Sequence, residues 1–229
     1  MSKKSFSFGL GGWLQLYSFG VAKYIRERGL HQDAVFTGCS TGVTSSLITI
    51  YILFLFAGAI VATLSAFDGD FDLALEYCKT YGIPRMYSHF FGPFKMHDYV
   101  QDCLEYTCDL RKCDSAFLGG LRVLVTKIPS FAQSAFQTPF ASPDDLKQCI
   151  LASCATFPFA GPVFNGKSWM VDGSYAISNV DNDAGTITVS PFYFSSALIK
   201  PSRYVPLWWS LFPPADSETI DWLFRCGDG

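Results

Sequence analysis

Charged side chains are scarce in this chain, and no long basic run occurs in it. Only 16% of the 229 residues are charged, and 17 Lys and Arg against 20 Asp and Glu give a net charge of −3. Proteins that bind nucleic acids present clustered positive charge to the phosphate backbone. The only basic pair near the start is Lys3 and Lys4. We therefore expect no nucleic-acid partner.

The spacings typical of metal sites and of dinucleotide-binding loops are also missing. The sequence contains no C-x-x-C, no H-x-x-x-H and no G-x-G-x-x-G. Cys103, Cys108 and Cys113 are five residues apart, which turns successive thiols by about 140° around a helix and gives them no shared face. The sequence therefore predicts no metal site and no cofactor.

A secretory signal is likewise absent, because the opening MSKKSFSF carries charge without a following apolar run. Disulfides are rare where thiols are kept reduced. We therefore expect the eight cysteines to be reduced and the protein to be cytoplasmic.

Apolar residues, in contrast, are abundant: they make up 49% of the chain, which includes 22 Phe. That composition is too hydrophobic for a disordered chain and predicts a large core. The length suits one domain better than two, so we expect a single domain over residues 1–229.

Predicted strands and helices alternate along the chain. The patterns predict strands at 5–8, 30–36, 121–128 and 186–190, a short strand ending at Asp172, helices at 13–28, 68–81, 97–108, 144–153 and 217–225, and a loop over 83–96. Such alternation favours an α/β fold with a mainly parallel central sheet covered by helices on both faces.

The stretch FTGCSTG holds the first candidate site residues. Gly38, Ser40 and Gly42 form G-x-S-x-G, and the flanking residues read as strand, turn and helix. This context is typical of a nucleophile elbow, in which small neighbours let a substrate carbonyl approach the serine. The alternative is a serine between two glycines in an ordinary loop.

A second glycine-rich segment, residues 9–12 (GLGG), lies between the first strand and the first helix. Backbone N–H groups at a helix start can stabilise a developing oxyanion. The alternative is a tight connection without chemical function.

A serine needs a base to remove its proton, and the last histidine, His97, precedes most of the predicted strands. The usual hydrolase order with a final histidine is therefore excluded. A carboxylate is the remaining choice, and Asp172, followed by Gly173 after a short strand, fits best. Its alternative is an ordinary Asp-Gly turn.

Together these features resemble the patatin-like phospholipase/lipase family. Further blocks support the resemblance, namely ERG, DGDFDLALEYC, LASCATFPF, TVSPFYFS and WWSLFPP. It implies a three-layer α/β/α sandwich and a lipid acyl hydrolase that cleaves carboxylic esters through an acyl-enzyme. Ser40 and Asp172 would form a Ser-Asp dyad, and the amides of Gly11 and Gly12 would form the oxyanion hole. The implied partners are an acyl lipid and a membrane or lipid-droplet surface, to which the protein would be peripheral.

The chain also departs from the pattern of that family. Leu10, Leu14 and Gln15 stand where the family has a glycine, a basic residue and a glycine, and Ser174 makes the final motif D-G-S. The alternative function is therefore a catalytically impaired relative that acts as a lipid-surface binding or regulatory module.

The largest departure follows the elbow, where no charged residue occurs from Ala34 to Phe67. Deleting residues 43–58 restores the family reading, so this stretch is an atypical hydrophobic insertion that would add about 24 Å of helix. One hypothesis is a translated retained intron, since Gly42 can be encoded with the GT of a splice donor. The competing hypothesis is a real extension that inserts into a membrane through residues 43–67.

Overall fold

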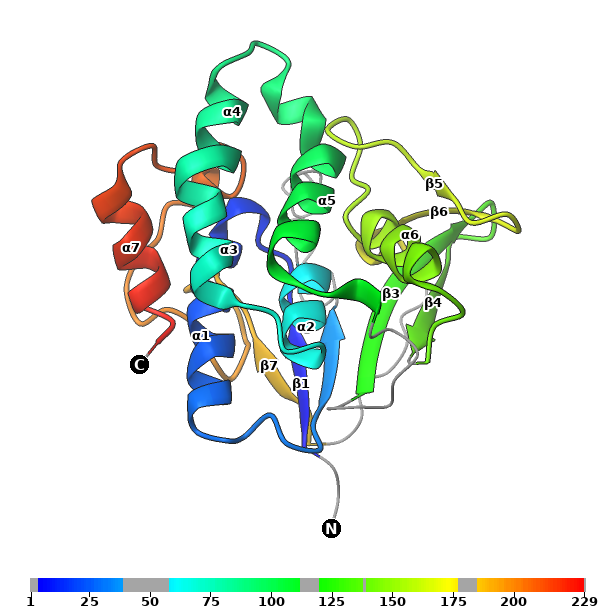
Figure 1. Cartoon of the computed structure of the whole chain (residues 1–229), viewed down its shortest axis with the longest axis horizontal. Helices are drawn as coiled ribbons and strands as arrows, with labels where there is room; N and C mark the ends of the chain where they lie inside the picture. Colours follow the sequence, from blue (N-terminus) through cyan, green and yellow to red (C-terminus); the bar gives the residue numbers. More distant parts are fainter. Residues whose placement is uncertain (1–3, 39–57, 112–119, 138, 177–184, 229) are drawn as a thin grey trace.

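The computed structural model describes residues 4–38, 58–111, 120–137, 139–176 and 185–228, and these form a mixed α/β fold around one sheet (Figure 1). The strands are β1 (Ser5–Phe8), β2 (Val35–Gly38), β3 (Gly120–Ile128), β4 (Ala132–Gln137), β5 (Val163–Phe164), β6 (Trp169–Asp172) and β7 (Ile187–Val189). The helices are α1 (Gln15–Glu27), α2 (Gly58–Ala66), α3 (Phe71–Tyr77), α4 (Ile83–Tyr87), α5 (Met96–Thr107), α6 (Pro143–Ser153) and α7 (Ser217–Arg225).

The central part of the sheet is parallel. Strands β7, β1, β2 and β3 are neighbours in this order and run the same way. Phe8 is paired with Val189 on one side and Gly38 on the other, so the carboxyl ends of these strands lie level. Every residue of β1 is buried, which is typical of a parallel strand covered on both faces.

Antiparallel strands complete the sheet beyond β2. β4 and β6 both run antiparallel to β3, and the two-residue β5 pairs with β6. The prediction of an α/β fold with a mostly parallel sheet is confirmed, with this antiparallel part as an addition.

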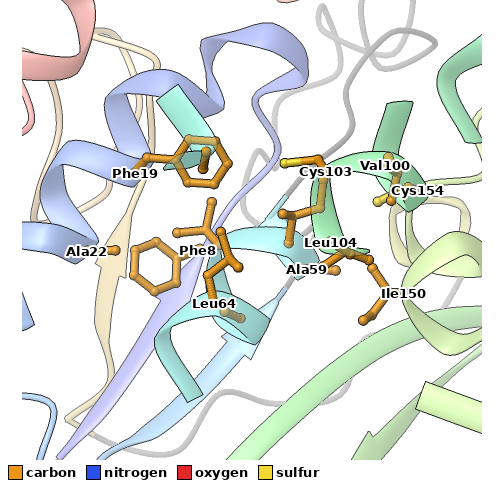
Figure 2. Close-up of a cluster of buried hydrophobic side chains, with 14 of the residues drawn as sticks. Phe8, Phe19, Ala22, Ala59, Leu64, Val100, Cys103, Leu104, Ile150 and Cys154 are labelled. Carbon is orange, nitrogen blue, oxygen red and sulfur yellow. The ribbon is translucent and has the colours of Figure 1, made fainter. Parts of the chain in front are cut away.

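The core lies between the sheet and the helices drawn in front of it. Figure 2 shows Phe8 of β1 beside Phe19 of α1 and Leu64 of α2, and all three side chains are fully buried. α2 is buried at all nine of its positions. This agrees with its place directly over β2, where an apolar helix needs no polar face.

Several predicted elements are confirmed. The first strand and the last helix have the predicted bounds, and β3, α5, β6 and β7 agree within two residues. The predicted helix at 13–28 begins with a 3₁₀ turn, Gly12–Leu14, and continues as α1. The cap of α6 is Ser142, whose side chain accepts from the amide of Asp145, while Pro143 occupies the first turn.

Three predictions are corrected. The second strand covers Val35–Gly38 instead of 30–36. The helix predicted at 68–81 is α3, capped by Asp70, followed by a π-helical turn at Cys78–Gly82. The loop predicted at 83–96 instead contains α4 and the 3₁₀ turn Gly92–Lys95, since Pro84 occupies a first-turn position that requires no backbone donor.

Among the described residues, no helix combines the length and the hydrophobicity that a bilayer crossing requires. Residues 43–57 of the predicted insertion lie outside the described part of the chain.

Candidate active site

The strands β2 and β6 end beside each other on one edge of β3. Arg122 and Val123 pair with both β2 and β4, and Val125 to Lys127 pair with both β4 and β6. Because a strand has only two edges and β4 occupies one of them over this whole length, β2 and β6 share the other. β2 is parallel to β3 and β6 is antiparallel, so their carboxyl ends meet.

The register places the predicted site residues close together. Gly38, the last residue of β2, is opposite Val123, and Asp172, the last residue of β6, is opposite Val125. Two residues along a strand correspond to about 7 Å. The first glycine of the predicted elbow and the predicted base therefore lie side by side, although 134 residues separate them along the chain.

Asp172 is buried and held in place by local hydrogen bonds. Its side chain is 1% exposed, and its Oδ1 accepts from the amide of Ser174 at 2.8 Å. Its Oδ2 accepts from Oγ1 of Thr156 at 3.3 Å, and its amide donates to the carbonyl of Ala155 at 3.1 Å. A buried carboxylate requires such donors to remain ionised.

The turn that follows Asp172 is also held by β4, which pairs with the other edge of β3. The carbonyl of Gly173 accepts from Nε2 of Gln133, a buried residue of β4, at 2.9 Å. A β-carbon on Gly173 would lie 3.0 Å from the carbonyl oxygen of Leu124, so the turn approaches β3 too closely for a side chain.

The charge of Asp172 also influences a neighbouring tyrosine. Burial raises the pKa of Tyr175 above its ordinary value, and the nearby carboxylate of Asp172 raises it further. The backbone of Phe157 acts in the opposite direction by hydrogen bonding.

The glycine loop after β1 lies at the same end of the sheet. Phe8, the last residue of β1, is paired with Gly38, so the loop begins next to the end of β2. Gly12 has a φ of +52°, and a β-carbon there would come within 2.1 Å of the carbonyl oxygen of Ser210. A β-carbon on Gly11 would lie 2.9 Å from Cγ of Pro191. Both positions therefore require glycine.

Gly11 precedes the 3₁₀ turn Gly12–Leu14, and Gly12 is the first residue of that turn. Backbone N–H groups at the start of a helix have no acceptor within the helix. Within the described ranges, no carbonyl accepts from either amide. The loop thus offers two backbone donors at the carboxyl edge of the sheet, as an oxyanion hole requires.

A narrow, mostly apolar pocket adjoins the loop. Gly12 and Trp13 form its wall on one side, and Ile60 of α2, Tyr77 of α3 and Val100 of α5 form the rest together with neighbouring side chains. The lining is apolar, but the cavity of about 10 Å³ has room for little more than one water molecule.

Three sequence blocks that lie far apart in the chain meet around these groups. LASCATFPF supplies Ala155 and Thr156, which hold Asp172; TVSPF supplies Pro191 at the loop; and WWSLF supplies Ser210. Sequence reasoning did not assign roles to Thr156, Gln133 or Ser210. The first and last could have been found from their blocks, whereas nothing in the sequence distinguishes Gln133.

Ser40 and Gly42 lie outside the described residues. The two ends of the stretch that contains them are in contact, since a β-carbon on Gly38 would lie 2.4 Å from Cα of Ala59, the second residue of α2. No family model and no curated protein matches this chain.

Proposed function

We propose that the chain is a serine lipid acyl hydrolase in which Ser40 is the nucleophile and Asp172 the base. The observation that carries the proposal is the meeting of β2 and β6 on one edge of β3. Consecutive Cα atoms are 3.8 Å apart, so the Cα of Ser40 lies within about 7.6 Å of that of Gly38. Asp172 lies about 7 Å from Gly38 along the same edge, so an elbow that turns toward β6 would bring Ser40 within reach of Asp172.

The reaction would begin with transfer of the Ser40 hydroxyl proton to the carboxylate of Asp172 while Oγ attacks the ester carbonyl. The amides of Gly11 and Gly12 would stabilise the negative charge on the carbonyl oxygen. The tetrahedral intermediate would then lose the alcohol, which takes the proton back from Asp172. This leaves the acyl group on Ser40.

Deacylation would follow the same route with water. Asp172 would remove a proton from the attacking water molecule, the carbonyl carbon would again become tetrahedral, and Ser40 would leave with the proton that Asp172 returns. The products are a fatty acid and free enzyme, and no metal or cofactor enters any step.

The proposed family is the patatin-like phospholipase/lipase family, with its three-layer α/β/α sandwich. The complete burial of β1 supports cover on both faces of the sheet, and the convergence of the resembling blocks on one site supports the family. The substrate would be an acyl lipid, such as a triacylglycerol or phospholipid. The protein would be cytoplasmic and peripheral to a membrane or lipid droplet.

The decisive test combines a fluorophosphonate probe with hydrolysis of a p-nitrophenyl ester. Wild-type protein should label and hydrolyse, Ser40→Ala should do neither, and Asp172→Asn should lose about 10⁴-fold in kcat. Asn is isosteric with Asp and keeps the acceptor for the Ser174 amide, so its melting temperature serves as the control for folding. Equal turnover by wild type and either variant would exclude the dyad.

A second candidate function is a non-catalytic lipid-surface or regulatory module. One observation favours it: Gln15, at the position of a family glycine, is buried, and its Oε1 has no hydrogen-bond partner within the described part of the chain.

A probe that labels neither the full chain nor a variant lacking residues 43–58 would support this candidate. Labelling of the shortened variant alone would show that the insertion impairs an otherwise competent site. It would also favour the retained-intron hypothesis, which transcript sequencing tests directly.

A further inference from the structure

Exposed phenylalanines gather at the end of the molecule that carries the candidate site. Phe90 and Phe91, in the turn between α4 and α5, are 89% and 65% exposed, and Phe94 is also exposed. Phe157, in the segment after α6, is 73% exposed. In Figure 1 the α4–α5 turn projects beyond the sheet on the side toward which the parallel strands point.

This aromatic tip, consisting of Phe90, Phe91, Phe94 and Phe157, is connected to the site by packing. The ring of Phe94 stacks on that of Phe159 with centroids 5.4 Å apart. Phe159 and Phe157 belong to the short segment that begins with Thr156, the residue that donates to Asp172. A surface bound by the tip would therefore lie next to the carboxylate.

The stretch of sequence that contains Phe90, Phe91 and Phe94 carries cations and no carboxylate. No carboxylate occurs in the sequence between Glu76 and Asp98, whereas Lys79, Arg85 and Lys95 do. Lys79 and Arg85 form ion pairs with carboxylates elsewhere on the surface. Lys95 is exposed and directly follows Phe94, and within the described ranges it forms no ion pair.

We propose that the aromatic tip inserts into an anionic phospholipid surface while Lys95 contacts the headgroups. This inference rests on the proposed function, because a lipid acyl hydrolase must bind the lipid surface that holds its substrate. Phe side chains at a membrane interface bury their rings in the acyl region, and adjacent Lys side chains are attracted to anionic lipids. Docking in this orientation would place Asp172 and the glycine loop toward the lipid that supplies the ester.

The shape of the tip favours lipid over a folded protein partner. Phe90 and Phe91 meet edge to face at 5.2 Å on a convex turn, and Phe90 projects with almost its whole side chain exposed. A protein partner would need a matching pocket for these rings, whereas a fluid acyl layer accommodates them in any arrangement.

Co-sedimentation of the full chain with phosphatidylcholine vesicles, with and without phosphatidylserine, tests the proposal. We expect Phe90→Ser/Phe91→Ser to lower the partition coefficient at least about tenfold. Lys95→Gln should lower it about fivefold, and only on vesicles that contain phosphatidylserine. The matched control is Leu73→Ser/Tyr106→Ser, which also removes two exposed apolar side chains. Leu73 lies in the first turn of α3 and Tyr106 in the last turn of α5, at the ends of these helices away from the aromatic tip. This variant should leave vesicle binding unchanged.

The outcomes separate docking from catalysis. Vesicle binding that survives Phe90→Ser/Phe91→Ser would overturn the inference even if the protein hydrolyses a water-soluble ester. The inference would also be overturned if Phe90→Ser/Phe91→Ser lost no more vesicle binding than the control variant Leu73→Ser/Tyr106→Ser. It would be overturned as well if Phe90→Ser/Phe91→Ser lost self-association and kept vesicle binding. Specific loss of binding in a protein that cleaves no ester would support the docking surface and reject the proposed hydrolase.

Discussion

The two chain segments that end on the same edge of β3 are held there in different ways. β2 ends at Gly38, where the backbone of α2 leaves no space for a side chain. β6 ends at Asp172, which is held by hydrogen bonds to Ser174, Thr156 and Ala155. A β-carbon that would lie well under 3.0 Å from backbone atoms forces β2 and α2 apart, whereas hydrogen bonds can be removed one at a time. Substitutions should therefore have abrupt effects in the first segment and graded effects in the second.

The largest effect is expected from Gly38→Ala. Its β-carbon would overlap the Cα and amide nitrogen of Ala59 at 2.4 and 2.8 Å, and separating β2 from α2 should cost about 3 kcal/mol or more. The change in urea midpoint measures this. Gly161→Ala is the matched control, because a β-carbon at Gly161 meets nothing within 4 Å, and it should change stability by no more than about 0.5 kcal/mol. Similar midpoints for the two variants would contradict the steric account.

Gly173→Ala should have an intermediate effect. The added β-carbon would lie 3.0 to 3.3 Å from atoms of Leu124, a distance that small shifts can relieve, so we expect a loss of about 1 to 2 kcal/mol. Ester hydrolysis should fall as well, because the shift moves Asp172. A destabilisation as large as that of Gly38→Ala would erase the difference between the two segments.

Thr156→Val should have a smaller effect. It removes the hydroxyl that donates to Oδ2 of Asp172 while keeping the shape of the side chain, and one hydrogen bond contributes about 1 kcal/mol. We expect kcat to fall up to about tenfold, and Thr156→Ser to retain most of it. If the serine variant is as impaired as the valine variant, the methyl group of Thr156 matters and the hydroxyl does not.

The smallest effect is a change in the titration of Tyr175. Burial raises its pKa above the ordinary value of 10.0, and the charge of Asp172 adds to this. Asp172→Asn should therefore lower the pKa of Tyr175 while leaving it raised by burial. Titration of ¹³Cζ-labelled tyrosine, assigned with Tyr175→Phe, measures the shift. An unchanged pKa would show that Asp172 carries no charge near the ring.

The same shift has a defined sign for stability. Because the folded pKa of Tyr175 lies above the unfolded one, its stabilising contribution is complete below about pH 10 and decreases as the pH rises through the folded pKa. Asp172→Asn should reduce this alkaline loss of stability.

Local patterns predicted much of the secondary structure. The last helix has the predicted bounds because Asp216 caps it with a hydrogen bond to the amide of Thr219 and Arg225 occupies its last turn. The strand that ends at Asp172 was predicted from its short apolar run and the Asp-Gly turn. These signals act within a few residues, so one sequence is enough to read them.

Other elements depend on contacts that a single sequence does not reveal. β4 has the sequence AQSAFQ, which lacks β-branched residues, and it forms because β3 offers it a complete pairing edge. α4 follows a π-helical turn that carries the chain past Gly82 without interruption. The Pro- and Phe-rich composition of residues 83–96 had predicted a loop.

The sequence predicted which residues belong to the candidate site but not how they are arranged in space. Asp172, Gly11, Gly12, Gly38 and Gly173 were chosen from motifs, and the structure brings all five to one edge of the sheet. The register of β6 on β3 determines how close Asp172 comes to Gly38, and no short-range pattern encodes that register. Ser40 and Gly42 remain predictions.

The shared edge of β3 also has a consequence for the order of folding. During synthesis β2 and the first half of β3 can pair early, but the second half of that edge must wait until β6 has been made. Until then its unpaired backbone groups are available to a strand of another chain. Expression of fragments that stop before Trp169 should therefore yield aggregates, because β6 is the strand that covers this part of the edge.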